Sequence, residues 1–270
     1  MFKMQCLLYR KGDDIMGIFD IFKNNEETSN TSILENYIKS KFVINTDNIS
    51  YSNNDIARME KNCEIIEKMG IPSYKELKLV PVDGIVKIEE KRELVLRLIF
   101  NFFVGRKAFN RLNNIGDVND ADVMMLAIKY VPEFNQLASY LSEISKGNIS
   151  ENELDNLSFL GEQAVVLACV LGLAEKPLEN VVTLGSNLIN IFEKYKSIDD
   201  LIEGSNIISK EEIMEYADYI SRLDLYCMEL IISKKDPKTI KDLNLDSIRE
   251  HKSAIDMVTS YSIDKYLIAK

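Results

Sequence analysis

The 270-residue chain contains no tryptophan, one histidine (His251) and four cysteines. A single histidine excludes metal sites built from several histidines, and it leaves one residue at most for histidine-based catalysis. The cysteines, at positions 6, 63, 169 and 227, are widely spaced and form no Cys-x-x-Cys pair. This spacing argues against a zinc site and against a disulfide framework. We therefore expect no metal and no other bound cofactor.

Positive charge is also scarce. The 33 Lys and Arg residues are outnumbered by 43 Asp and Glu residues, and the formal net charge is −10. This excess of negative charge disfavours nucleic acid and anionic membranes as partners, because phosphate-rich surfaces would repel an acidic protein. A basic protein is the partner that the charge favours.

Long hydrophobic runs are absent as well. The most apolar stretch, residues 159–171, is uninterrupted only from 164 to 171. A bilayer-spanning helix needs roughly 20 apolar residues, so we expect a cytoplasmic protein. The sequence also contains no phosphate-binding loop, dinucleotide-binding glycine pattern, nucleophile elbow or EF-hand loop.

The start of the chain differs from the rest. Residues 1–15 have the features of an upstream extension added by mis-annotation, because Met16-Gly17-Ile18-Phe19 reads as a natural N-terminus and residues 11–13 can be encoded by a ribosome-binding sequence. We expect residues 16–54 to form an N-terminal helix with flexible polar linkers. Residues 55–270 are expected to form a single α-helical domain.

Apolar residues recur every three or four positions through most of that domain, which predicts helices. Gly70 and Pro72 end the first, and Ser150 and Ser209 begin capping boxes. The predicted helices are 55–69, 89–109, 120–130, 133–144, 159–171, 182–195, 213–231 and 245–269, with a polar loop after residue 195. The fold class is therefore all-α, an irregular multi-helix globular bundle with at most one small β-hairpin near 80–88, turning at Asp83-Gly84.

The order of several motifs resembles a known family. These are Arg58-x-x-Lys61-Asn62 before Met69-Gly70-Ile71-Pro72, Gly161-Glu162-Gln163-Ala164 before Val170-Leu171-Gly172-Leu173, Glu211-Glu212-Ile213-Met214 with Asp218 and Arg222, and Glu250-His251-Lys252-Ser253-Ala254-Ile255. Together they resemble the uncharacterised, mainly bacterial family catalogued as domain of unknown function 4272. That family usually carries tryptophans near positions occupied here by Leu167 or Ala168, Tyr226 and Met257. The resemblance implies no activity.

Polar residues at positions where apolar ones are expected are the candidates for a site. Glu162, in the first turn of a helix, either complements the helix dipole, which is worth roughly 0.3–1 kcal/mol, or is a buried partner of Arg222. Asp218 and Arg222 are spaced i,i+4 and adjoin on one helical face. Apolar and aromatic neighbours suggest that Arg222 is partly buried. We favour a structural ion pair, which could extend to Glu162 or Glu250, over a ligand clamp.

His251 lies near the apolar stripe formed by Ile248, Ile255 and Val258, with Glu250 beside it. We expect a core histidine that makes one hydrogen bond, because catalysis would also need a nucleophile or carboxylate in a shared cleft. Asp224, on the inner stripe of its helix, could pair with a lysine or with His251.

Two functions remain open. The favoured one is a non-catalytic protein-interaction module, such as an antidote or accessory protein for a basic partner. The alternative is an enzyme or small-molecule binder that uses Glu162, Asp218, Arg222, Glu250 and His251. A deep pocket where these side chains converge would favour the alternative, and a closed core with an acidic exposed face would favour interaction.

Overall fold

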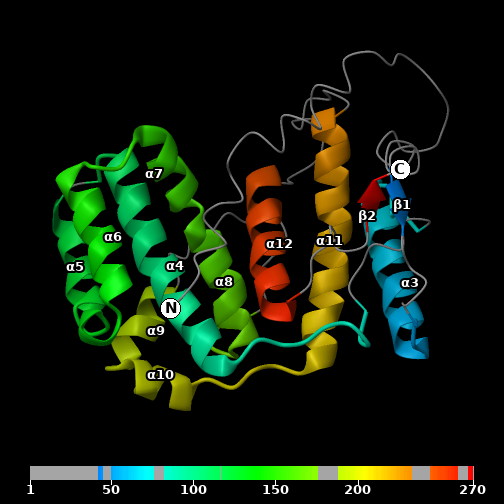
Figure 1. The fold of residues 1–270 in the computed structure, drawn as a ribbon, viewed down its shortest axis with the longest axis horizontal. Helices are drawn as coiled ribbons and strands as arrows, with labels where there is room; N and C mark the ends of the chain where they lie inside the picture. Colours follow the sequence, from blue (N-terminus) through cyan, green and yellow to red (C-terminus); the bar gives the residue numbers. More distant parts are fainter. Residues whose placement is uncertain are drawn as a thin grey trace.

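The computed structural model describes residues 42–44, 50–75, 82–115, 117–175, 188–232, 244–260 and 267–269. Within these ranges the predicted all-α architecture is confirmed (Figure 1). The expectations for residues 1–15 lie outside the described residues, as does most of segment 16–54.

The longer helices pack side by side, and the short helices α9 and α10 lie across one end of them (Figure 1). Their bounds are α3 (Asn53–Lys68), α4 (Lys91–Leu112), α5 (Asp117–Ala127), α6 (Asn135–Lys146), α7 (Glu151–Ser158), α8 (Leu160–Val170), α9 (Ile189–Lys194), α10 (Ile198–Gly204), α11 (Lys210–Ile232) and α12 (Leu245–Thr259). A 3-10 turn, η2 (Val131–Glu133), precedes α6, and two short antiparallel strands pair β1 (Phe42–Ile44) with β2 (Leu267–Ala269). None of the helices in the described part is both long and apolar enough to cross a bilayer.

Helix α4 is the centre of one half of the molecule. It packs against α5, α6, α7, α8 and α10, while α12 lies between α8 and α11, and α11 packs against α3. The close contact between α4 and α8 depends on glycine, because a Cβ on Gly105 would lie 2.6 Å from the backbone nitrogen of Gly161. This crossing brings the first turn of α8 into the protein interior.

Three segments differ from the sequence prediction. The residues expected to form a polar loop after 195 include α10, whose N-cap Ser197 accepts a hydrogen bond from the Asp200 N–H. The last helix ends at Thr259 rather than at 269, because Ser260 adopts a left-handed conformation with φ 49°.

The described part of the possible hairpin, residues 82–88, is a turn without strands. Its backbone N–H groups do not form the cross-strand hydrogen bonds of a hairpin. The N–H groups of Ile85 and Val86 donate to the Val82 carbonyl, and the Lys87 N–H donates to Thr259 at the end of α12.

Candidate functional site

Helix α11 lies between α3 and α12 and carries polar residues toward both neighbours (Figure 1). One group, here called the Arg222 cluster, contains Asn62, Ser73, Asp218 and Arg222. The other, here called the His251 cluster, contains Asn101, Glu162, Gln163, Tyr216, Glu250 and His251. Five of the six candidate residues from the sequence are therefore divided between these two clusters, and Asp224 belongs to neither.

The Arg222 cluster joins α11 to α3. Arg222 is only 2% exposed, and its Nε and Nη2 donate to the two carboxylate oxygens of Asp218 at 3.3 and 3.2 Å. Its Nη1 donates to the Ser73 carbonyl at 2.6 Å. Asn62 on α3 donates to Asp218 at 2.7 Å. The i,i+4 pair is therefore a buried ion pair whose carboxylate is fixed by a second helix.

The segment after α3 supplies the Ser73 carbonyl. Gly70 leaves the helix with φ 77° and Tyr74 has φ 52°, so the chain turns sharply on both sides of Ser73. The Tyr74 hydroxyl donates to Glu229 on α11 at 2.8 Å. This contact holds the segment against the same helix that carries Arg222.

The N-terminal end of α3 is fixed by Asp55. Ser52 and Asp55 form a reciprocal capping box, and Asp55 also accepts hydrogen bonds from the Asp83 N–H and from Arg58. Burial raises the pKa of this carboxyl, but the hydrogen bonds outweigh burial, and the net effect is a pKa below the ordinary value. Asp55 therefore connects α3 to the turn at residues 82–86.

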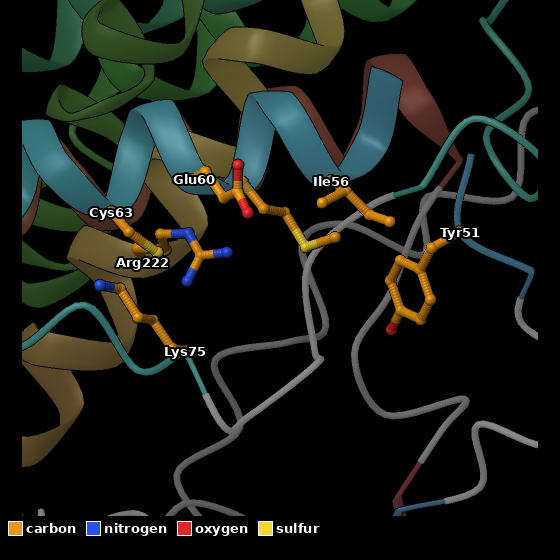
Figure 2. A pocket seen from close by; sticks show the side chains of 7 residues that line it. Tyr51, Ile56, Glu60, Cys63, Lys75 and Arg222 are labelled. Carbon is orange, nitrogen blue, oxygen red and sulfur yellow. The ribbon is translucent and has the colours of Figure 1, made fainter. Parts of the chain in front are cut away.

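A cavity of about 320 Å³ opens beside the Arg222 cluster (Figure 2). It is lined by Tyr51, Ile56, Met59, Glu60, Cys63, Lys75 and Arg222. Figure 2 shows Cys63, Lys75 and Arg222 gathered at one end, and Ile56 and Tyr51 at the other. The cavity therefore has a cationic end and an apolar end. Its volume is at the lower limit of small-molecule sites, roughly 300–1,000 Å³.

Cys63 is the thiol at the cationic end. Burial raises its pKa, although the neighbouring Arg222 partly offsets this effect. The Sγ atom lies 3.9 Å from the Ser73 carbonyl, to which it donates. Since the thiolate is the reactive form of cysteine, this side chain is poorly suited to act as a nucleophile.

The His251 cluster joins α8, α11 and α12. The Tyr216 hydroxyl lies 2.8 Å from Nδ1 of His251, and Nε2 lies 3.2 Å from a carboxylate oxygen of Glu162. The histidine thus has two hydrogen-bond partners, whereas one was expected. Glu162 stands in the first turn of α8, as predicted, and its side chain is fully buried.

A second line of hydrogen bonds extends this cluster to α4. Gln163 donates to Glu250 at 2.6 Å and accepts from Asn101 at 2.9 Å. The adjacent cavity has a volume of only about 20 Å³, which is room for about one water molecule. Glu162 and His251 are at most 3% exposed, so within the described structure no substrate reaches the His251 cluster.

One suggested pairing is replaced by another, and the suggested pairing of Asp224 with a lysine or with His251 is met by a lysine. Glu162 contacts His251 rather than Arg222, because α12 lies between α8 and α11 (Figure 1). Asp224 faces Lys252 and Arg249, whose charges partly offset the burial that raises its pKa.

The sequence analysis did not predict five members of these clusters, which are Asn62, Ser73, Asn101, Gln163 and Tyr216. A signal existed for three of them, because Asn62 and Gln163 belong to the quoted motifs and Ser73 directly follows one. Nothing in the sequence indicated Asn101 or Tyr216. In the described part of the chain, no group of three or more His, Cys, Asp or Glu residues has an arrangement that could hold a metal ion.

A family model described as a domain of unknown function, DUF4272, matches residues 58–266. The chain belongs to this family. No curated protein and no solved structure matches the chain. Both polar clusters lie within the DUF4272 match, whereas Tyr51 and Ile56 of the cavity precede it. The buried polar groups are thus part of the family domain, and the apolar end of the cavity is completed by residues outside it.

Proposed function

We propose that this DUF4272 protein is a small-molecule-binding domain whose ligand occupies the cavity between α3, the segment ending at Lys75, and α11. The observation that carries the proposal is that Arg222 is buried beside a cavity and does not use all of its hydrogen-bond donors on the described residues. A guanidinium has five N–H groups, and Arg222 makes three hydrogen bonds within the described structure. It is nearly completely buried, yet it lines a cavity.

A binding role suits the cavity better than catalysis. General acid–base or nucleophilic chemistry requires a group in its reactive protonation state near the substrate. Burial raises the pKa of the lining thiol, Cys63, which disfavours its reactive thiolate form, and Glu162 and His251 are almost fully buried. The remaining polar lining residues, Glu60, Lys75 and Arg222, are suited to recognition by charge.

The dye anilinonaphthalene sulfonate, an anion with an apolar body, tests this proposal. We expect it to bind the native full-length protein, and Ile56→Asp to weaken binding at least fivefold. Ile56 is 44% exposed, so the change should leave the fold intact. The matched control is Ile128→Asp, immediately after α5, at an isoleucine that is 62% exposed. Equal affinity in the wild type and both variants would contradict the proposal.

A second candidate is interaction with a basic protein, as an antidote or accessory module. The net charge of −10 favours it, and Glu151, Glu153 and Asp155 all face solvent on α7. Affinity capture from the host with wild-type protein and with a variant carrying lysine at these three positions would test it. A reproducible basic partner lost only in the variant supports interaction, and recovery of no reproducible partner counts against it.

We infer that the protein acts in the bacterial cytoplasm. The three cysteines within the described residues, Cys63, Cys169 and Cys227, are buried thiols that are not joined in disulfides, which suits a reducing compartment. Fractionation of the host would test this location, and recovery in a secreted fraction would contradict it.

A further inference from the structure

We propose that the ligand is a monocarboxylate with an apolar chain, and that Arg222 binds its carboxylate. This inference rests on the small-molecule-binding function proposed above and specifies the ligand class. It assigns a recognition role to a residue that the sequence suggested only as half of a structural ion pair.

The first argument is the set of donors that Arg222 retains. Each terminal nitrogen of a guanidinium carries two N–H groups. Nη1 uses one on the Ser73 carbonyl, and Nη2 uses one on Asp218. One N–H on each nitrogen therefore has no acceptor among the described residues. Two donors on adjacent nitrogens of a planar group match the two oxygens of a carboxylate.

The second argument is that the guanidinium is held in place before any ligand arrives. Asp218 occupies one edge of it, and Asn62 fixes Asp218 from α3. The Ser73 carbonyl fixes Nη1 by accepting one of its two N–H groups. A donor whose orientation is already set loses little conformational entropy on binding. Asn62, Ser73 and Asp218 are thus positioning residues for Arg222.

The third argument is charge. The charged lining residues Lys75, Arg222 and Glu60 sum to one positive charge. Asp218 and Glu67, which pair with Arg222 and Lys75, bring the total for these five groups to −1. A ligand with a single negative charge is therefore repelled less than a dianionic phosphate, and its carboxylate is held by the hydrogen bonds of Arg222 rather than by net charge. The N-terminus of α3, a type of position that often binds phosphate, is closed by Ser52 and Asp55.

The fourth argument is the opposite end of the cavity. Ile56, Met59 and Tyr51 line it, and Ile56 is one of the few large apolar side chains exposed to solvent among the described residues. An apolar chain extending from the carboxylate would cover these side chains. The resulting burial of apolar surface would add to affinity.

Four probes that share one chain test the inference: octanoate, octanol, octylamine and octyl phosphate, each below its micelle concentration. Titration calorimetry on the full-length protein should show octanoate binding at least tenfold more tightly than each of the others, because charge-assisted hydrogen bonds contribute about a factor of ten or more. Arg222→Lys should abolish the preference for octanoate over octanol. Arg111→Lys, at an exposed arginine on α4, is the matched control and should retain it.

A second variant keeps the test decisive if Arg222→Lys fails to fold. Lys75 is 57% exposed, so Lys75→Gln should fold normally, weaken octanoate about threefold by removing a nearby charge, and leave octanol unchanged. Equal binding of octanoate and octanol by the wild type would overturn the carboxylate assignment. Tighter binding of octylamine or octyl phosphate would also overturn it.

The two proposals fail in distinguishable ways. If anilinonaphthalene sulfonate binds and Ile56→Asp weakens it, but octanoate does not bind, only the ligand class is wrong. If dye binding is also insensitive to Ile56→Asp, the binding function itself is wrong.

Discussion

The imidazole Nε2 of His251 lies 3.2 Å from a carboxylate oxygen of Glu162, although 89 positions separate the two residues. Tyr216 contacts the other ring nitrogen, so α8, α11 and α12 are linked through one side chain. The adjacent cavity holds about one water molecule. This relationship therefore stabilises the junction of three helices.

A double-mutant cycle tests this structural role. Removing one partner of a buried ion pair leaves the other as a buried charge without a partner, which lowers the free energy of unfolding by roughly 3–5 kcal/mol. We expect Glu162→Ala and His251→Ala each to lower the free energy of unfolding substantially, with a coupling of roughly 0.5–3 kcal/mol. Urea unfolding measures it. The exposed pair Glu143 and Lys146, 3.3 Å apart, is the control and should couple by less than about 1 kcal/mol. Strictly additive effects at Glu162 and His251 would refute the prediction.

The glycine contact between α4 and α8 gives a steric prediction. An added methyl group at Gly105 would meet the Gly161 nitrogen at 2.6 Å, so Gly105→Ala must separate the two helices. We expect a loss of roughly 1–3 kcal/mol in unfolding free energy. Gly84→Ala is the control, because nothing lies within 4 Å of its added Cβ, and it should change stability by less than about 0.5 kcal/mol. Equal stability of the two variants would contradict the close packing.

Asp55 gives a prediction about pH. Its pKa is lowered in the folded protein, so its ionised form favours folding, and that contribution is lost as the pH falls from the ordinary value through the folded pKa. At neutral pH, Asp55→Asn should cost about 2 kcal/mol. The deficit should shrink between about pH 5 and about pH 2.

Unfolding in denaturant at several pH values tests the Asp55 prediction. Ser52→Ala serves as the comparison, because the hydrogen bond from the Asp55 N–H to the Ser52 hydroxyl contains no titrating group, and part of its cost should persist in acid. A deficit of Asp55→Asn that does not change with pH would exclude the proposed linkage.

Asp224 gives a pH dependence of stability opposite in sign to that of Asp55. Burial raises the pKa of its carboxyl, so the charged form opposes folding at neutral pH, and wild-type stability recovers as the pH falls and the group takes up a proton. Asp224→Asn should therefore be more stable than wild type at neutral pH, and the advantage should vanish below the ordinary pKa of 3.8.

Thermal unfolding of Asp224→Asn at neutral and acidic pH measures this difference. Asp199→Asn, at an exposed aspartate on α10, controls for the loss of a negative charge and should change stability by less than about 0.5 kcal/mol. A destabilised Asp224→Asn at neutral pH would show that Lys252 and Arg249 outweigh burial.

Local sequence determined the helices that have a clear apolar stripe. The residues expected to form a helix over 213–231 lie within α11 (Lys210–Ile232), since helical periodicity depends on neighbours three and four positions apart. Helix α10 was missed because it has only two buried apolar residues, Ile198 and Leu201. The last helix was predicted too long because the left-handed conformation of Ser260 breaks an otherwise helical pattern. Family membership was also readable from short motifs in order, and the family match confirms it.

Only the tertiary structure decided which polar groups meet. The sequence indicated Asp218 with Arg222 because four positions bring them together on one helix. It did not indicate Ser73, 149 positions from Arg222, or the pairing of Glu162 with His251 instead of Arg222. Such contacts depend on which helices pack together, and here α12 lies between α8 and α11. The cavity beside Arg222 arises in the same way, because Arg222 on α11 meets lining residues that all lie between Tyr51 and Lys75.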